Sequence, residues 1–249
     1  MVSQVADDTE ALRTARERVL ATIADACARA GRDPSSVELV AVSKTVPAER
    51  LRAAVAAGLT IFGENRVQEA EEKVGAVDGA TWHLIGPLQR NKARRAVEAF
   101  DVVESVDSVE LARRLDRLVA ETAPSPGRLP VLLQVNVDDD PTKAGFEPPA
   151  LAAVIAEILG LAHLDVRGLM TIGRLVDRPE DARPTFEALR SLSERLRAVD
   201  DRLGPALSMG MSADYPVAIE EGATIVRVGQ AIFGERPHTH DGGPAHAHR

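Results

Sequence analysis

Short apolar runs alternate with helical patterns through most of this sequence, and this alternation constrains the fold more than any other feature. Short runs rich in valine, leucine and isoleucine predict strands buried on both faces, and the amphipathic segments between them predict helices covering a parallel sheet. The predicted strands are residues 37–43, 60–63, 81–86, 101–106, 130–137, 164–172, 206–209 and 224–229. Eight such units in 249 residues favour an α/β fold, a closed (β/α)8 TIM-type barrel.

The helical patterns cover residues 48–57, 67–74, 92–99, 109–121, 151–159, 184–199 and 215–221, with a short closing segment at 231–233. An additional amphipathic helix, from about Asp8 to Ala30, precedes the first strand. The alternative is an open doubly wound sheet, but no Gly-x-Gly-x-x-Gly motif follows the first strand, which disfavours its dinucleotide-binding version. We expect one barrel domain over residues 8–236 and a disordered, histidine-rich tail over 237–249.

The composition argues against several classes of partner. The net charge of −8 disfavours a nucleic acid or an anionic membrane surface. No run could span a bilayer, and the first residues lack the pattern of a secretion signal. Cys27 is the only cysteine, which rules out an internal disulfide and suits a reducing compartment. We therefore expect a soluble, cytoplasmic protein.

The first predicted strand ends in Ser43 and Lys44, and Pro47 then stops the strand. A lysine at the carboxyl end of a buried strand either reaches solvent or serves as a functional amine. Partial desolvation lowers the proton affinity of a lysine and makes it nucleophilic, as Schiff-base formation with an aldehyde requires. Because a barrel carries its active site at the carboxyl ends of its strands, Lys44 is expected on the reactive face.

The last two predicted strands end in segments that suit a phosphate group. Gly210 and Gly229 would let the backbone approach an anion closely, and Ser212 would add a hydroxyl donor. The alternative is that these glycines serve only tight turns. An amine for an aldehyde and a cradle for a phosphate, on one barrel face, together suggest pyridoxal 5′-phosphate (PLP).

Acidic residues on the same face have simpler interpretations. Glu64 is expected to pair with Arg66 or Lys44, with no need for a catalytic role. Residues 138–140, three aspartates, are typical of a solvated acidic turn, because a metal site would need further ligands at suitable spacing. The histidines of the tail also lack a carboxylate or cysteine set that would complete a site. We therefore predict no metal site.

Seven segments, in order along the chain, resemble a known family. They are Ala41–Thr45, Phe62–Glu69, Trp82–Lys92, Lys143–Phe146, Arg167–Met170, Leu207–Ser212 and Arg227–Gly234. Together they resemble the pyridoxal phosphate homeostasis proteins, which are single-domain relatives of the barrel half of alanine racemase. The resemblance covers nearly all of residues 10–236, and the tail after Arg236 lies outside it.

The resemblance implies a set of cofactor-binding residues: Lys44, Asn65, Ser212, Arg227, Gly229 and Gln230. Lys44 would hold PLP covalently as an aldimine, Arg227 would face the pyridine nitrogen, and Asn65 would lie near the ring. The three others would hold the phosphate. Because position 230 is often threonine in the family, only the backbone N–H of the glutamine is expected to donate there.

An arginine at the ring nitrogen has a chemical consequence. Unlike a carboxylate, it cannot keep the pyridine protonated, so carbanion stabilisation is weaker. Racemisation also needs an acid or base on the opposite face of the cofactor. In alanine racemase a tyrosine from a separate β-domain of the partner subunit supplies it, and this sequence shows no such domain. We therefore predict no catalytic residue.

The resulting hypothesis is a protein of vitamin B6 homeostasis that holds PLP without substantial turnover. Apo forms of PLP-dependent enzymes are the expected recipients, and the family allows a monomer or a homodimer. One alternative is a PLP-dependent amino-acid racemase or decarboxylase in which His83 or Tyr215 acts as the second base, although both are more typical of packed residues. The other alternative is a phosphate-binding barrel that uses no PLP.

Overall fold

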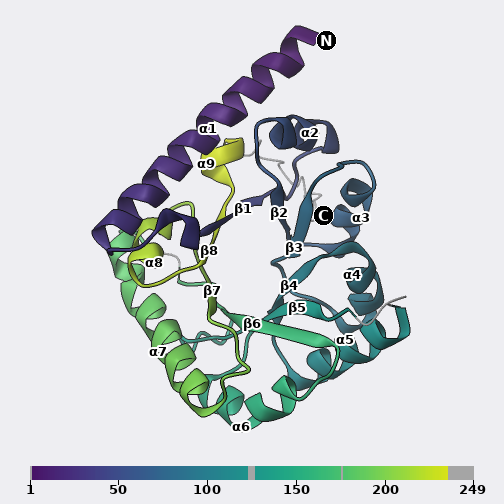
Figure 1. The fold of residues 1–249 in the computed structure, drawn as a ribbon, viewed down its shortest axis with the longest axis vertical. Helices are drawn as coiled ribbons and strands as arrows, with labels where there is room; N and C mark the ends of the chain where they lie inside the picture. The colour runs from purple at the N-terminus through teal and green to yellow at the C-terminus, as the bar shows by residue number, and fades with distance from the viewer. Residues whose placement is uncertain (1, 123–126, 175, 235–249) are drawn as a thin grey trace, which may run out of the picture.

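The computed structural model describes residues 2–122, 127–174 and 176–234 (Figure 1). Within these ranges eight parallel strands pair in chain order, and the pairing of β1 with β8 closes the barrel. The strands are β1 (Glu38–Val42), β2 (Ile61–Glu64), β3 (Thr81–Leu84), β4 (Val102–Val106), β5 (Leu129–Gln134), β6 (Leu164–Met170), β7 (Ala206–Met211) and β8 (Ile225–Val228). The predicted barrel is confirmed and the open sheet is excluded. The tail predicted over residues 237–249 lies outside the described residues.

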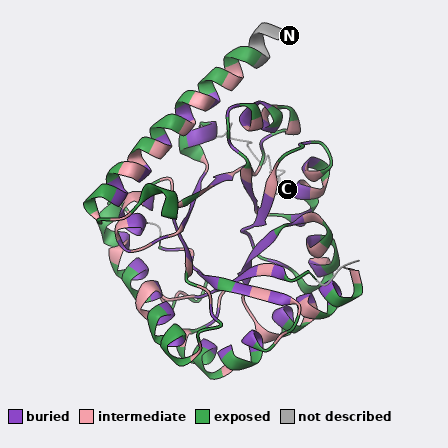
Figure 2. Cartoon of the chain, viewed as in Figure 1, coloured by how far each residue is buried: buried purple, intermediate pink, exposed green. Residues whose placement is uncertain are grey.

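The outer helices follow the strands one by one. They are α2 (Ala48–Ala56), α3 (Val67–Val74), α4 (Ala93–Ala99), α5 (Val109–Thr122), α6 (Pro148–Leu159), α7 (Arg183–Val199), α8 (Tyr215–Glu220) and α9 (Gln230–Phe233). Short 3-10 turns at Pro34–Ser36, Arg90–Lys92 and Pro179–Ala182 were not predicted. Figure 2 shows buried residues on the sides of the helices that face the barrel and exposed residues on the outside. No helix in the described ranges is long and apolar enough to cross a membrane.

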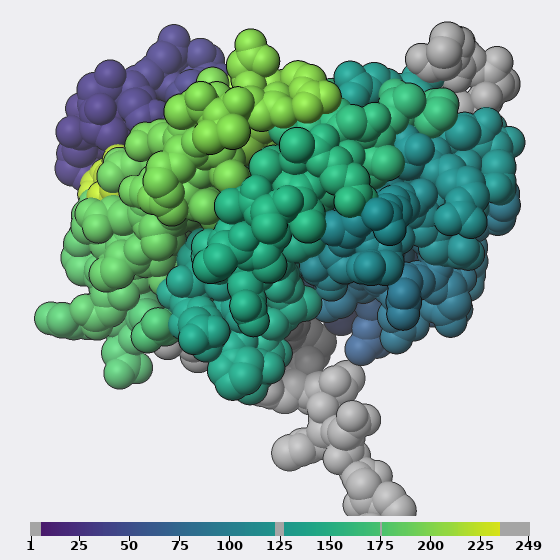
Figure 3. Space-filling model, turned by 90° about the horizontal axis from the view of Figure 1, so that it is seen from below, coloured from purple at the N-terminus to yellow at the C-terminus, as the bar shows by residue number. Residues whose placement is uncertain are grey.

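The additional N-terminal helix is confirmed as α1 (Val2–Arg29), which begins before the predicted Asp8. It packs against α2, α8 and α9, so the first segment of the chain lies beside the last ones (Figures 1 and 3). The helix after β8, α9, has only four residues. Because α9 is too short to cover β8, α1 occupies the place of an eighth outer helix.

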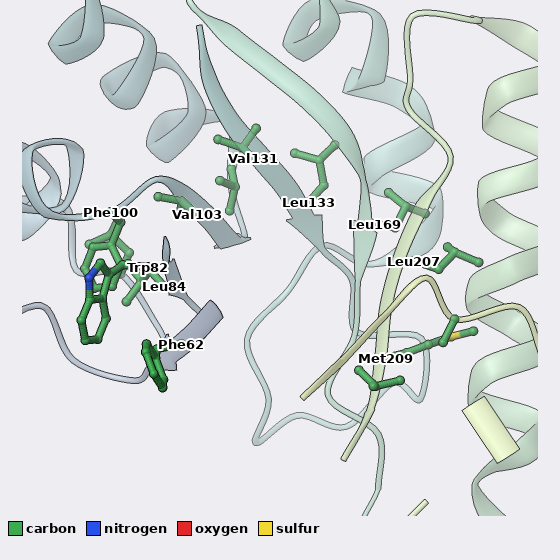
Figure 4. Packing of buried hydrophobic residues seen from close by; sticks show 14 of the residues in the cluster. Phe62, Trp82, Leu84, Phe100, Val103, Val131, Leu133, Leu169, Leu207 and Met209 are labelled. Atoms are coloured by element: carbon green, nitrogen blue, oxygen red, sulfur yellow. The ribbon is translucent and has the colours of Figure 1, made fainter. Parts of the chain in front are cut away.

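Two apolar layers hold the barrel together. The larger layer lies between the sheet and the helices and includes the tilted pair Phe62 and Trp82, with ring centroids 5.4 Å apart (Figure 4). The smaller cluster consists of Val40, Val102, Leu132, Met170 and Ile225, from β1, β4, β5, β6 and β8. Because these strands are spread around the barrel, their side chains can meet only inside it.

The covering role of α1 predicts a stability effect. Ile23 is 1% exposed and belongs to the core cluster. We expect Ile23→Ala to lower the free energy of unfolding by about 2–5 kcal/mol, because it removes buried methyl and methylene groups and leaves a cavity. Asp25→Ala, on the exposed side of the same helix, should change it by less than about 0.5 kcal/mol. Urea denaturation followed by circular dichroism measures both, and equal stabilities would contradict the role assigned to α1.

Candidate functional site

The six residues expected to bind a cofactor come from four neighbouring strands. Ser212 follows β7, Arg227 lies in β8, Gly229 and Gln230 follow β8, Lys44 follows β1, and Asn65 follows β2. These strands are consecutive around the barrel, since β8 pairs with both β7 and β1. The residues therefore share one arc of the rim at the carboxyl ends of the strands, which is the face where barrels carry their active sites.

Lys44 is half-buried and lies two residues beyond the end of β1. The register pairs Ala41 with Val228, so the end of β1 runs beside the end of β8. Side chains alternate between the two faces of a strand, and Val40 belongs to the cluster inside the barrel. Lys44 itself lies in the turn that follows the strand, close to the end of β8.

The loops after β7 and β8 are joined by a hydrogen bond. The backbone N–H of Gly229 donates to Oγ of Ser212 at 3.2 Å, and both residues are half-buried. Gly210 precedes this contact with a φ of +90°, and a Cβ there would lie 2.6 Å from the Cβ of Ala218. Only glycine lets the end of β7 pack this closely against α8. This hydrogen bond holds a hydroxyl and a backbone N–H together at one point of the rim, and both are groups that can donate to a phosphate.

Arg227 is buried inside the barrel and its guanidinium is fixed by two acceptors. Nη1 donates to Oγ of Ser208 at 2.5 Å, and Nη2 donates to the carbonyl oxygen of Thr171 at 2.7 Å. The hydroxyl of Ser208 in turn donates to Oε2 of Glu104 at 2.5 Å. Strands β4 and β7, and the residue that follows β6, therefore contribute to the orientation of one side chain of β8.

Glu104 is fully buried and is also hydrogen-bonded through Oε1 to Nδ1 of His83, at 2.7 Å. Burial acts to raise the pKa of Glu104, but the contact with His83, the charge of Arg227 and the hydrogen bond from Ser208 outweigh it and hold the pKa below its ordinary value. Burial lowers the pKa of Arg227, against the opposing charges of Glu104 and Asp214. The interpretation of His83 as a hydrogen-bonded core histidine is confirmed.

Glu64 is fully buried and pairs with Lys73 of α3, a partner that the sequence interpretation did not consider. Nζ of Lys73 lies 2.6 Å from Oε1 of Glu64, and the same oxygen accepts from the hydroxyl of Ser43 at 2.7 Å. Burial raises the pKa of Glu64, while the hydrogen bonds from Lys73 and Ser43 act to lower it. The sequence did indicate that Lys73 is buried, because Val67, Ala70 and Lys73 are spaced by three and form the buried face of α3.

The acidic turn after β5 differs from its prediction. Only Asp139 is exposed; the Asp138 side chain is 8% exposed and accepts from the hydroxyl of Thr185 at 2.6 Å. Nζ of Lys143 lies 3.9 Å from Asp138 and 3.7 Å from Asp140. The turn is therefore partly buried and bonded: α7 supplies a hydrogen-bond donor, and Lys143 of the β5–α6 loop supplies an ion-pair partner. No group of side chains in the described ranges could hold a metal ion.

Asn65 and Tyr215 are also placed by packing. Asn65 is half-buried after β2, and the loop after β3 lies so close that a Cβ on Gly86 would be 2.3 Å from the Asn65 carbonyl oxygen. Tyr215 begins α8 and is 6% exposed within the main core cluster. The expected packing of Tyr215 at a helix start is confirmed.

This arrangement agrees with comparison to known families. The sequence model of the family described as "alanine racemase, N-terminal domain" matches residues 18–237. The chain belongs to this family.

Within the family, the chain groups with the pyridoxal phosphate homeostasis proteins. The protein of that name from Aquifex aeolicus strain VF5 is 43% identical over 221 residues, which cover 88% of this chain and 96% of the relative. The one from Pseudomonas aeruginosa strain PAO1 is 43% identical over 231 residues, covering 92% of this chain and 96% of the relative. PipY of Synechococcus elongatus PCC7942, solved with PLP bound, superposes with a TM-score of 0.75 at 43% identity and covers 85% of this chain and 100% of that one.

Sequence reasoning did not find the residues that orient Arg227. Glu104 and Ser208 lie within apolar strands, and each is separated from Arg227 by many residues in the sequence. A single acidic residue inside a β-branched run was a usable signal, because an unpaired carboxylate is rarely buried. Its partners could be identified only from the barrel closure.

The lowered pKa of Glu104 predicts a pH dependence of stability. Its folded pKa lies below its unfolded value, so the stabilisation is present above the unfolded pKa and is lost as pH falls through the folded pKa. In Glu104→Gln this contribution is absent. We therefore expect an unfolding free energy lower by about 1–3 kcal/mol at neutral pH. The free energy of unfolding of Glu104→Gln should also decrease less on acidification than that of the wild type.

Urea denaturation at a series of pH values measures the effect, and Glu17→Gln, at an exposed carboxylate, is the matched control. Parallel pH profiles for the wild type and Glu104→Gln would contradict the assigned charge pairing.

Proposed function

We propose that this protein binds PLP in vitamin B6 homeostasis, holding it as a covalent Schiff base of Lys44 without substantial turnover. The main observation behind this proposal is that these groups lie on one arc of the barrel rim. The arc carries the half-buried Lys44, the buried Arg227 and the two hydrogen-bonded loops after β7 and β8. The names of the relatives, and the PLP bound to PipY, support the same reading.

The donor groups on this arc fit PLP. Its phosphate requires hydrogen-bond donors, and the hydroxyl of Ser212 and the N–H groups of Gly229 and Gln230 would supply them. The N–H of Gly229 now donates to Oγ of Ser212 at 3.2 Å, and a phosphate would replace that oxygen as its acceptor. Its ring nitrogen requires a donor that stays charged, and the Arg227 guanidinium has five N–H groups, of which Ser208 and Thr171 take two. PLP supplies an aldehyde that a lysine amine can attack.

The surroundings of the arc favour holding over turnover. Arg227 donates to a ring nitrogen without protonating it, so the electron sink is weak. The two candidates for a second base are engaged elsewhere, since His83 is 3% exposed and bound to Glu104, and Tyr215 is 6% exposed in the core. A proton transfer at the cofactor needs a group within hydrogen-bond reach. We accordingly propose apo PLP-dependent enzymes as the recipients of the held cofactor.

The proposal predicts which lysine reacts. The sequence has four lysines, Lys44, Lys73, Lys92 and Lys143. Titration with PLP should produce a visible imine band, borohydride should fix it, and peptide mapping should find the label on Lys44. We expect Lys44→Ala to lose the band and Lys92→Ala, the matched control, to keep it. A label on another lysine would contradict the assignment, and no band at all would favour the phosphate-binding barrel without PLP.

The proposal also predicts the absence of substantial amino-acid turnover. PLP-loaded protein incubated with D- or L-alanine should show no racemisation or decarboxylation above the level of Lys44→Ala, measured by chiral chromatography. The same loaded protein should reactivate an apo aminotransferase added to it, because the Schiff base is reversible. Turnover by the wild type that is lost in Lys44→Ala would support the racemase or decarboxylase alternative and defeat the holding role.

A further inference from the structure

The turn that carries Lys44 is strained in its backbone. After β1 the chain turns back, so that the N–H of Val46 donates to the carbonyl oxygen of Ser43 at 3.0 Å. Within this turn Thr45 has a φ of +66°. A β-branched residue in the left-handed region is a genuine outlier, and it persists only where the surrounding structure holds it. The direction of Lys44 therefore depends on contacts made by the residues on either side of it.

Helix α3 supplies such contacts on both sides. Nζ of Lys73 donates to the carbonyl oxygen of Ser43 at 2.9 Å, just before Lys44. The N–H of Thr45, just after Lys44, points to Oε2 of Glu69 at 3.4 Å. Residues four apart on a helix lie on one face, so Lys73 and Glu69 reach the turn together.

The buried charge on Lys73 is not explained by stability alone. Its side chain is 9% exposed and that of its partner Glu64 is 0% exposed. Replacing a buried ion pair by apolar side chains of similar volume is often neutral or stabilising. The second carboxylate oxygen of Glu64 has no hydrogen-bond partner, so the pair is not fully satisfied either. An apolar side chain could not, however, donate a hydrogen bond to the carbonyl oxygen of Ser43.

We propose that Lys73 is the positioning residue for Lys44. It fixes the strained turn from the helix side of β1, through Ser43 and Glu64, and so keeps the Lys44 amine at the rim where the cofactor binds. Lys73 itself is paired with Glu64 and takes no covalent part. This inference rests on the proposed function and identifies the contact that positions Lys44.

Two variants separate positioning from stability. Lys73→Met leaves the Glu64 carboxylate buried without its counter-charge, so this variant should melt at a lower temperature than the wild type. The double variant Lys73→Met with Glu64→Leu removes both charges at similar volume and should regain most of that loss. Neither variant can donate to the Ser43 carbonyl. Lys92→Met, outside α3, is the matched control.

The variants are compared as full-length proteins at a temperature at which circular dichroism shows all of them folded. In the double variant the dissociation constant for PLP should rise by about tenfold. The pH midpoint of the visible imine band should move toward that of the imine that PLP forms with a simple amine in water. Without PLP, hydrogen exchange at the Val46 amide should be about tenfold faster than in the wild type, because its acceptor Ser43 is no longer fixed.

The outcomes distinguish the two proposals. A stable double variant with the wild-type dissociation constant, imine midpoint and Val46 exchange rate would overturn the positioning role of Lys73. Absence of an imine band in the wild type would overturn the proposed function instead. In that case the exchange rates of the PLP-free proteins still decide whether Lys73 holds the turn.

Discussion

The pairing of β1 with β8 is the constraint on which the rest of this structure depends. It turns a row of strands into a closed surface, removes both sheet edges and gives the interior a fixed volume. It also places the end of the first strand beside the end of the last one. Lys44 and Gly229, separated by most of the sequence, become neighbours on the rim only through this closure.

Closure also creates a site where charges are held away from water. The barrel interior holds Arg227, Glu104 and His83, all at or below 3% exposure, beside an apolar cluster. Desolvation penalises the charges of Arg227 and Glu104, and the hydrogen bonds made by this group of residues offset part of that penalty. Apolar side chains would fill the same space without this desolvation penalty. The polar side chains instead fix the direction of the Arg227 guanidinium. In the same way Lys73 fixes the turn in which the left-handed backbone of Thr45 costs roughly 1–3 kcal/mol in strain.

The fold could be predicted from sequence because its determinants are local. Each strand is a short apolar run and each helix has its own period, so the order of elements, once written down, leaves few topologies. Lys44 and the glycine loops could be placed at the carboxyl ends of their strands because the strand ends could be counted. Lys73 and Glu104 were missed, because a lysine within a helix and a glutamate within a strand acquire partners only when distant segments meet. Asp138 was misjudged for the same reason, since α7 covers it.

The position of α1 has a consequence for synthesis of the chain. Its apolar face, with Leu12, Val19 and Ile23, packs against α8 and α9, which are made nearly two hundred residues later. Helix α1 therefore leaves the ribosome long before the two helices that cover part of it have been made. Contacts of such long sequence separation slow folding and leave apolar surface exposed in the nascent chain. Helix α1 is thus made before α2 to α7 but can be fully buried only after α8 and α9 have been made.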